Sequence, residues 1–159
     1  MGRGNPADRY LPWRDSRGWQ CRRCGRCCVD YVVPLTAGEA MVYPIKYGPF
    51  VVVANRGRRY LLKRGDGSCI FLTYNNGVAY CNIYYQRPLA CRLYPFYITR
   101  RPIEGLPAER AAYRNLYVYL DRHCPGVNAG KGIETLVKKA VETWLTYNAP
   151  YSFRVPARP

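Results

Sequence analysis

Four of the eight cysteines of this 159-residue chain fall in one short run, which constrains the fold more than any other feature. The run is Cys21-Arg22-Arg23-Cys24-Gly25-Arg26-Cys27-Cys28, a CxxCxxCC pattern. Thiolates held this close repel one another unless a cation or cluster neutralises them or oxidation joins them. What these sulfurs hold therefore decides how the chain folds.

The other four cysteines are spread along the chain, at Cys69, Cys81, Cys91 and Cys124. Three of them stand in turn-like phrases, namely Gly67-Ser68-Cys69, Tyr80-Cys81-Asn82 and His123-Cys124-Pro125-Gly126. Turns let a backbone wrap around a sulfur-bound metal. All eight cysteines are accordingly candidate metal ligands.

The N-terminal segment bears on the choice between metal and disulfides. Met1 to Gly18 is polar and basic throughout and lacks the apolar core of a signal peptide. We therefore expect an intracellular, cytoplasmic protein, in which metal ligation is favoured over a disulfide framework. A disulfide-stabilised domain stays the alternative, because hyperthermophiles keep intracellular disulfides and the Arg-, Tyr- and Pro-rich composition is compatible with such a source.

The charge of the chain is strongly positive, with 25 Lys and Arg against 10 Asp and Glu, a net +15. Such a balance, rich in Arg, favours contact with a polyanion, so RNA or the ribosome is one expected partner through basic terminal arms. A basic shell around a thiolate-rich centre, or a solubilising surface, is the alternative. No apolar run approaches the roughly 18 residues that span a bilayer, and no membrane partner is expected.

Local patterns predict several elements in the first half of the chain. Thr36 and Glu39 form a capping-box pattern ahead of a helix over residues 37–46. Turn signals predict two hairpins, pairing 50–54 with 59–63 around Asn55-Arg56-Gly57 and 69–74 with 78–81 around Asn75-Asn76-Gly77. The second hairpin would bring Cys69 and Cys81 together at its open end.

In the second half, helical turns are expected at 83–85 and 89–92, a strand at 116–120, and a helix whose apolar stripe over 133–145 is core. The expected fold is α+β: a small metal-stabilised domain with short antiparallel hairpins, irregular cysteine loops and a C-terminal amphipathic helix. It divides into a basic arm (1–19), a cysteine-cluster domain (20–147) and a Pro/Arg-containing tail (148–159).

The ordered set of all eight cysteines resembles the CxxCxxCC, or YkgJ-like, cysteine-cluster family. The resemblance covers roughly Cys21 to Leu145 and rests on Cys69-Ile70-Phe71-Leu72, on Arg87-Pro88-x2-Cys91-Arg92-x-Tyr94-Pro95 and on Cys124-Pro125-Gly126 as well as the first run. It implies a zinc- or iron-chelating domain, and flagellin lysine methylases carry a related pattern that looks like an iron-sulfur cluster site. Ile70 stands where family members often have proline.

Spacing suggests how the sulfurs divide. Cys21, Cys24 and Cys27 have the two-residue gaps that a cubane favours, and Cys124 precedes a proline as the fourth ligand of small ferredoxins often does. Neighbouring side chains of extended backbone point apart, so Cys28 would join a second centre of zinc or a second cluster. That second centre would be held by Cys28, Cys69, Cys81 and Cys91. One centre held by four of the eight is the rival, and spacing favours a 4Fe-4S cluster over zinc.

Arg87 and Arg92 flank this site and are predicted as cofactor-binding residues that donate hydrogen bonds to sulfur or to nearby carbonyls, although ordinary surface arginines are the alternative. His123, the single histidine, is more often a structural side chain than a ligand in such a setting. No catalytic constellation is present, so no catalytic residue is predicted. We expect a structural or electron-carrying module with a redox or protein partner, or an RNA- or ribosome-associated protein on a metal-stabilised scaffold.

Overall fold

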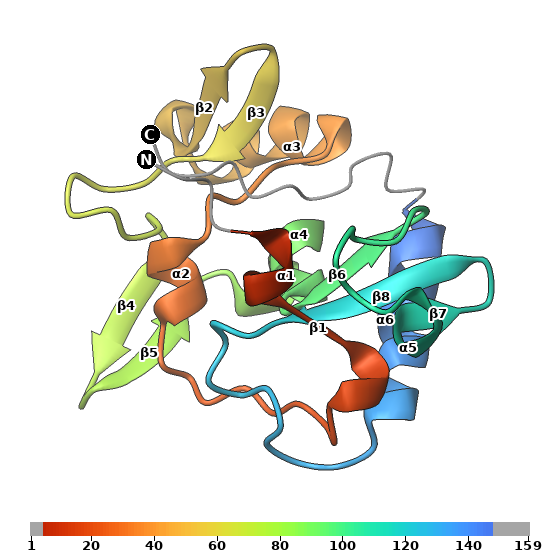
Figure 1. The fold of residues 1–159 in the computed structure, drawn as a ribbon. Coiled ribbons are helices and arrows are strands. Elements are labelled where there is room, and N and C mark those ends of the chain that lie inside the picture. The colour runs from red at the N-terminus through yellow and green to blue at the C-terminus, as the bar shows by residue number, and fades with distance from the viewer. Residues whose placement is uncertain (1–4, 148–159) are drawn as a thin grey trace. The chain divides into compact units, whose positions relative to one another are not determined.

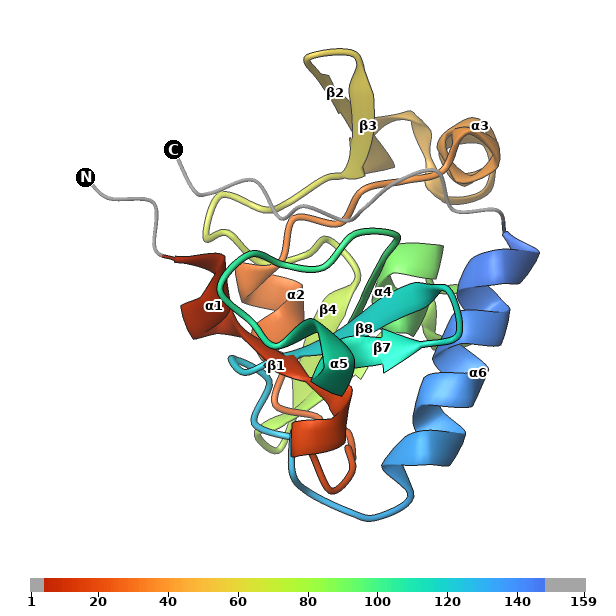
Figure 2. The ribbon, with the colours of Figure 1, turned by 45° about the vertical axis from the view of Figure 1, so that its right-hand side comes forward.

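The computed structural model describes residues 5–147 and divides the chain into two compact units (Figures 1 and 2). Unit 1 comprises Met1–Arg22 and Leu93–Pro159, and unit 2 comprises Arg23–Arg92. The boundaries between the units run through the segment predicted as a single cysteine-cluster domain. The tail predicted for 148–159 lies outside the described residues.

Unit 1 is built on an antiparallel sheet whose central strand is β8 (Leu116–Asp121). The strands β1 (Tyr10–Pro12) and β7 (Ala112–Tyr113) pair with opposite ends of β8, and β6 (Phe96–Thr99) pairs along it. The predicted strand at 116–120 is thus confirmed. Its apolar residues are almost fully buried, because the strand has partners on both sides.

The long helix α6 (Ile133–Thr146) packs against β6 (Figure 2). The face predicted as core is the face that is buried, as Val137 and Val141 are 0% and 1% exposed. Three short helices complete the described part of unit 1: α1 (Pro6–Arg9), the 3-10 helix η1 (Trp13–Asp15) and α5 (Ala108–Ala111).

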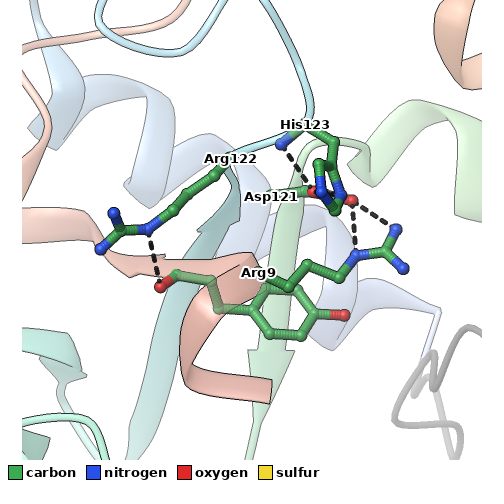
Figure 3. A network of polar contacts seen from close by, with 5 residues as sticks. Arg9, Asp121, Arg122 and His123 are labelled. Atoms are coloured by element: carbon green, nitrogen blue, oxygen red, sulfur yellow. Dashed lines mark hydrogen bonds and ion pairs between the residues drawn. The ribbon is translucent and has the colours of Figure 1, made fainter. Parts of the chain in front are cut away.

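A buried carboxylate ties the first segment of the chain to β8 (Figure 3). The Nη2 of Arg9 lies 2.6 Å from Oδ2 of Asp121, whose side chain is 5% exposed. The same carboxylate accepts from the backbone N–H of His123 at 3.0 Å, and Arg122 donates through Nε to the carbonyl of Tyr10 at 3.2 Å. Residues 9–12, within the segment predicted as an arm, are therefore fixed to the sheet by side chains as well as by strand pairing.

Unit 2 contains α3 (Ala37–Tyr47), which begins at the predicted capping box. Thr36 accepts from the N–H of Glu39, and Glu39 accepts from the N–H of Thr36 at 2.9 Å. The helix is followed by the 3-10 helix η2 (Pro49–Val51). Short helices α2 (Arg26–Asp30), η3 (Tyr84–Gln86) and α4 (Leu89–Leu93) complete the helical content of unit 2, and the last residue of α4 already belongs to unit 1.

Both predicted hairpins are present in unit 2 (Figure 1). They pair β2 (Val52–Asn55) with β3 (Arg58–Leu61) and β4 (Leu72–Asn75) with β5 (Val78–Cys81). Arg56-Gly57 and Asn76-Gly77 have positive φ at both central residues, the geometry of a type I′ turn that matches the strand twist. The strands are shorter than predicted, since Phe50 belongs to η2 and Cys69 to the turn before β4. The expected α+β class with short antiparallel strands is confirmed.

Three strands of unit 1, β1, β6 and β7, were not predicted. The predicted helical turn at 89–92 is followed closely by β6, which begins at Phe96 directly after Pro95. The strand β1 lies in the segment predicted as an arm. Each of these strands is defined by its pairing with β8, and β1 lies far from β8 in the sequence. Within the described residues, no helix is both long enough and apolar enough to cross a bilayer.

Candidate metal centre

The two units hold different numbers of cysteines. Cys21 and Cys124 belong to unit 1, and the other six belong to unit 2. The structure joins none of the eight by a disulfide. The predicted quartet of Cys28, Cys69, Cys81 and Cys91 therefore lies wholly within unit 2, whereas the ferredoxin-like set of Cys21, Cys24, Cys27 and Cys124 draws on both units.

Four separate elements supply the cysteines that gather in unit 2. Cys27 and Cys28 lie in α2, Cys69 in the turn before β4, Cys81 at the end of β5 and Cys91 in α4. Backbone contacts tie the first three elements together. The N–H of Cys69 donates to the carbonyl of Cys28 at 2.7 Å, and Leu72 pairs with Cys81. The expected approach of Cys69 and Cys81 at the open end of the hairpin follows from this register.

The thiols of this group are close enough to influence one another electrostatically. Burial raises the pKa of Cys91 well above its ordinary value, and the charges of Cys27, Cys69 and Cys81 raise it further. The hydrogen bond with Cys28, followed by burial, raises the pKa of Cys27 strongly. Burial also raises the pKa of Cys69 and of Cys81. Without a cation these sulfurs stay protonated, and a thiophilic metal is the natural way to ionise them together.

The predicted arginines differ in their relation to the thiols. The positive charge of Arg87 lowers the pKa of Cys27, Cys81 and Cys91, so its guanidinium lies near three of the sulfurs. It is held by a 3.0 Å hydrogen bond from Nε to the carbonyl of Tyr84 and lies 4.0 Å from the centre of that ring. Arg92 is exposed, and its charge acts on the phenol of Tyr43.

Two residues that shape this group were not predicted. Arg64 donates to the carbonyl of Leu72 at 2.9 Å, to that of Ile70 at 2.6 Å and to the hydroxyl of Ser68 at 3.2 Å, so it clamps the turn that carries Cys69. Gly25 has φ +73°, and a Cβ there would lie 2.5 Å from the hydroxyl of Tyr74. Only glycine therefore lets the CxxCxxCC run turn between Cys24 and α2.

The thiols are neighbours without forming a closed shell. Among residues 5–147, no three His, Cys, Asp or Glu side chains converge as they stand into an arrangement that would hold an ion. Cys69 is buried, and Cys27, Cys28, Cys81 and Cys91 are half-buried, whereas Cys24 is exposed. The chemistry of the donors fits zinc or iron, which bind thiolates, and side chains would have to change position to close the shell.

The cysteines of unit 1 have another environment. Trp19 donates through Nε1 to Sγ of Cys124 at 3.3 Å, and the N–H of Gln20 donates to the carbonyl of Gly126 at 3.1 Å. A Cβ at Gly126 would lie 2.2 Å from the carbonyl oxygen of Gln20, so this approach requires glycine. Cys21 is exposed. Nδ1 of His123 lies 3.4 Å from the carboxylate of Asp121, which agrees with the structural role expected of this histidine (Figure 3).

Comparison with known proteins identifies the domain. Residues 20–125, more than half of the chain, match the family CxxCxxCC, described as "Putative zinc- or iron-chelating domain". The chain belongs to the CxxCxxCC family. The resemblance noted from the sequence is thereby confirmed, and metal binding is supported in general terms. The CxxCxxCC match spans all eight cysteines. No curated protein and no solved structure matches the chain.

Proposed function

We propose that the protein is a metal-chelating module whose main centre is a tetrathiolate site in unit 2, held by Cys27, Cys69, Cys81 and Cys91. One observation supports this proposal: four elements of unit 2 each supply one of these cysteines, and Cys27, Cys69 and Cys81 are close enough to Cys91 for their charges to raise its pKa. A metal bound there would join α2, the turn before β4, the end of β5 and α4. Its first role is therefore structural.

Cys28 is the alternative to Cys27 in this set. Its carbonyl accepts from Cys69, and its thiol is hydrogen-bonded with that of Cys27. A rotation of α2 about its own axis would bring the sulfur of Cys28 to the site in place of the sulfur of Cys27. If Cys27 instead joins Cys21, Cys24 and Cys124 around a 4Fe-4S cluster, as the spacing favours, Cys28 completes the site in unit 2. That arrangement would make the protein an electron carrier.

Arg87 would offset part of the negative charge of the metal-bound centre. Four thiolates around a divalent ion leave a net charge of −2, which is costly in a half-buried site. The guanidinium of Arg87, already fixed by Tyr84, offsets part of that charge. Arg87 would thus favour the metal-bound state without ligating the metal.

The test is metal analysis of the anaerobically purified protein together with its visible absorption spectrum. A colourless protein with stoichiometric zinc supports the structural tetrathiolate centre. Broad absorption near roughly 400 nm with iron and labile sulfide supports a cluster. Protein that contains neither metal and whose thiols resist alkylation would overturn the proposal in favour of disulfides.

Serine substitutions then assign the ligands. Cys69→Ser, Cys81→Ser and Cys91→Ser should each abolish stoichiometric metal binding at the centre, because serine oxygen is a poor ligand for thiophilic metals. Cys24→Ser is the matched control, since Cys24 lies in the same run but is exposed. Cys27→Ser and Cys28→Ser distinguish the two arrangements of α2. Equal metal loss in the Cys24→Ser and Cys91→Ser variants would contradict the ligand set of Cys27, Cys69, Cys81 and Cys91.

A further inference from the structure

The outer face of α3 is apolar. Its exposed residues are Ala37, Gly38, Met41, Val42, Ile45 and Lys46, of which only the last is polar. Met41 and Ile45 are 73% and 88% exposed, and Phe50, just beyond the helix, is 80% exposed. A surface helix normally directs its polar side outward. The buried side of α3 is instead formed around Tyr43, whose hydroxyl donates to the carbonyl of Gln86 at 2.6 Å.

Four cations accompany this apolar face. Lys46 ends the helix, and the neighbouring β2–β3 hairpin carries exposed Arg56, Arg58 and Arg59 (Figure 2). Within the described residues, the side chains of these three arginines make no hydrogen bond or ion pair. We define the segment Ala37–Leu61, which contains α3, η2, β2 and β3, as the basic-apolar lobe.

The single carboxylate of the basic-apolar lobe is already engaged. One oxygen of Glu39 accepts from the N–H of Thr36 at 2.9 Å, and the other accepts from the N–H of Leu89 at 2.7 Å. No acidic side chain of this segment is therefore available to neutralise its four cations. Apart from the neutral Asn55, the exposed side chains of the lobe are apolar or positively charged.

We propose that the basic-apolar lobe docks on an anionic lipid surface, with Met41, Ile45 and Phe50 entering the interface and the cations contacting headgroup phosphates. An interfacial helix has this combination, an apolar face beside Lys and Arg. Each Lys or Arg near an anionic leaflet adds attraction of about 1 kcal/mol. Contact of this kind is peripheral and requires no membrane-spanning helix. The sequence analysis expected no membrane partner because no apolar run is long enough to span a bilayer, and that criterion does not detect peripheral contact.

The two other kinds of macromolecular partner fit the surface less well. Nucleic-acid interfaces are more polar than protein interfaces. Exposed isoleucine, methionine and phenylalanine at the centre of the surface do not suit such a partner. Protein–protein interfaces use Arg, Met and Phe but are depleted in Lys, and a protein partner would have to supply carboxylates opposite all four cations of the lobe. An anionic bilayer accepts both kinds of side chain at once, because its headgroup layer is charged and its acyl layer is apolar.

The experiment is co-sedimentation of the metal-loaded full-length protein with lipid vesicles. Vesicles of phosphatidylglycerol mixed with phosphatidylcholine should bind the protein, and vesicles of phosphatidylcholine alone should not. Ile45→Ser with Phe50→Ser should weaken binding by at least about tenfold, since these are the most exposed apolar side chains of the lobe. Arg56→Gln with Arg58→Gln should weaken binding by roughly fivefold for each arginine, and added salt should do the same.

Matched controls separate the lobe from general charge and stickiness. Lys138→Gln with Lys139→Gln on α6 removes the same charge at exposed positions outside the lobe. Tyr85→Ser removes a side chain that is 96% exposed. Both controls should bind anionic vesicles almost as the unmodified protein does, and all variants should keep the metal content.

Several outcomes would overturn the proposal. It fails if anionic vesicles bind no protein, if neutral vesicles bind it equally, or if the control pair reduces binding as much as the lobe pairs. A mass that rises with concentration and falls with Ile45→Ser and Phe50→Ser would assign the face to a second copy of the chain. Loss of RNA binding in the arginine pair, with no vesicle binding, would assign it to RNA.

Discussion

The interiors of the two units are built from different chemistry. In unit 1, Val118 and Leu120 of β8 and Val137 of α6 are 0% exposed, and the interior is closed by apolar side chains. In unit 2, apolar side chains such as Leu61 and Leu72 are also buried, each 3% exposed, but thiols from four elements gather in the same unit. Three of the four residues in β2, and three of the four in β4, are exposed. The strands of unit 2 thus leave most of their residues in solvent, and its cysteines add a group of thiols whose contribution to stability depends on what they bind.

This difference indicates what each unit depends on. Burial of apolar area stabilises unit 1 in any redox state and without cofactor, by about 25 cal/mol for each Å² removed from water. Protonated thiols attract one another much more weakly than a shared metal would hold them. If they ionise without a metal, the thiolates repel one another. Unit 2 should therefore be stable chiefly when a metal links its elements, whereas unit 1 should keep its structure without one.

Removal of the metal should have the largest effect. Apparent free energies for structural zinc are about 10–16 kcal/mol near neutral pH, so chelation should unfold most of unit 2. Amide hydrogen exchange would measure this, with protection lost in α3 and β2–β5 but kept in β8 and α6. Cys91→Ser should give the same pattern without a chelator, because it removes the thiol that neighbours three others.

Cys24→Ser provides the control for this experiment, since Cys24 is exposed and has no expected role in the centre of unit 2. Its exchange pattern should match that of the unmodified protein. Simultaneous loss of protection in both units at one chelator concentration would contradict the comparison and show that unit 1 also depends on the metal.

A cavity in the sheet of unit 1 should have the next largest effect. Leu120 is 0% exposed and stands opposite Leu11 on one side and Phe96 on the other. Leu120→Ala should lower the free energy of unfolding by about 2–5 kcal/mol, measured by urea denaturation. Metal content should be unaffected. Leu145→Ala, at a position that is 48% exposed, should change stability by less than about 0.5 kcal/mol.

Loss of the clamp at Arg64 should act on the metal and much less on the fold. Arg64→Lys keeps the charge but loses the forked geometry that serves the carbonyls of Ile70 and Leu72. Loss of a residue that orients a metal ligand typically costs 10- to 100-fold in metal affinity. We therefore expect about tenfold weaker metal binding for Arg64→Lys, measured by competition with a chromogenic chelator. Arg58→Lys is the control. An unchanged affinity in Arg64→Lys would show that the turn of Cys69 holds its shape without the clamp.

Much of unit 2 could be predicted because its signals are local. The capping box of Thr36 and Glu39 fixes the start of α3, and the turns at Arg56-Gly57 and Asn76-Gly77 require positive φ that identifies the hairpins. In unit 1, the apolar stripe of α6 likewise carries its own period. Each of these features depends on residues a few positions apart.

Features that depend on distant partners were not predictable in the same way. The strands β1 and β6 exist because β8 pairs with them, and neither has a pattern of its own long enough to indicate a strand. Spacing groups Cys27 with Cys21 and Cys24, and it gives no sign that Cys81 and Cys91, far away in sequence, also lie near Cys27 in the folded chain. The roles of Arg64 and Gly25 depend on contacts that only the folded turn creates.

The smallest expected effect is confined to alkaline pH and to unit 1. Burial, opposed by the charge of Arg9 and aided by that of Asp121, raises the pKa of Tyr10 from 10.0 to about 12. An unfolded chain therefore releases this proton at lower pH than the folded one does, so stability falls as pH rises from 10 to about 12. Below pH 10 the phenol is protonated in both states and contributes no pH dependence.

Tyr10→Phe should remove this part of the alkaline decline in stability. The measurement is the free energy of unfolding, obtained by urea denaturation at a series of pH values. Tyr85→Phe, at a site 96% exposed, should keep it. Equal alkaline slopes in Tyr10→Phe and the unmodified protein would show that the contact of Tyr10 with Tyr97, whose ring centres lie 4.8 Å apart, opens before the phenol ionises.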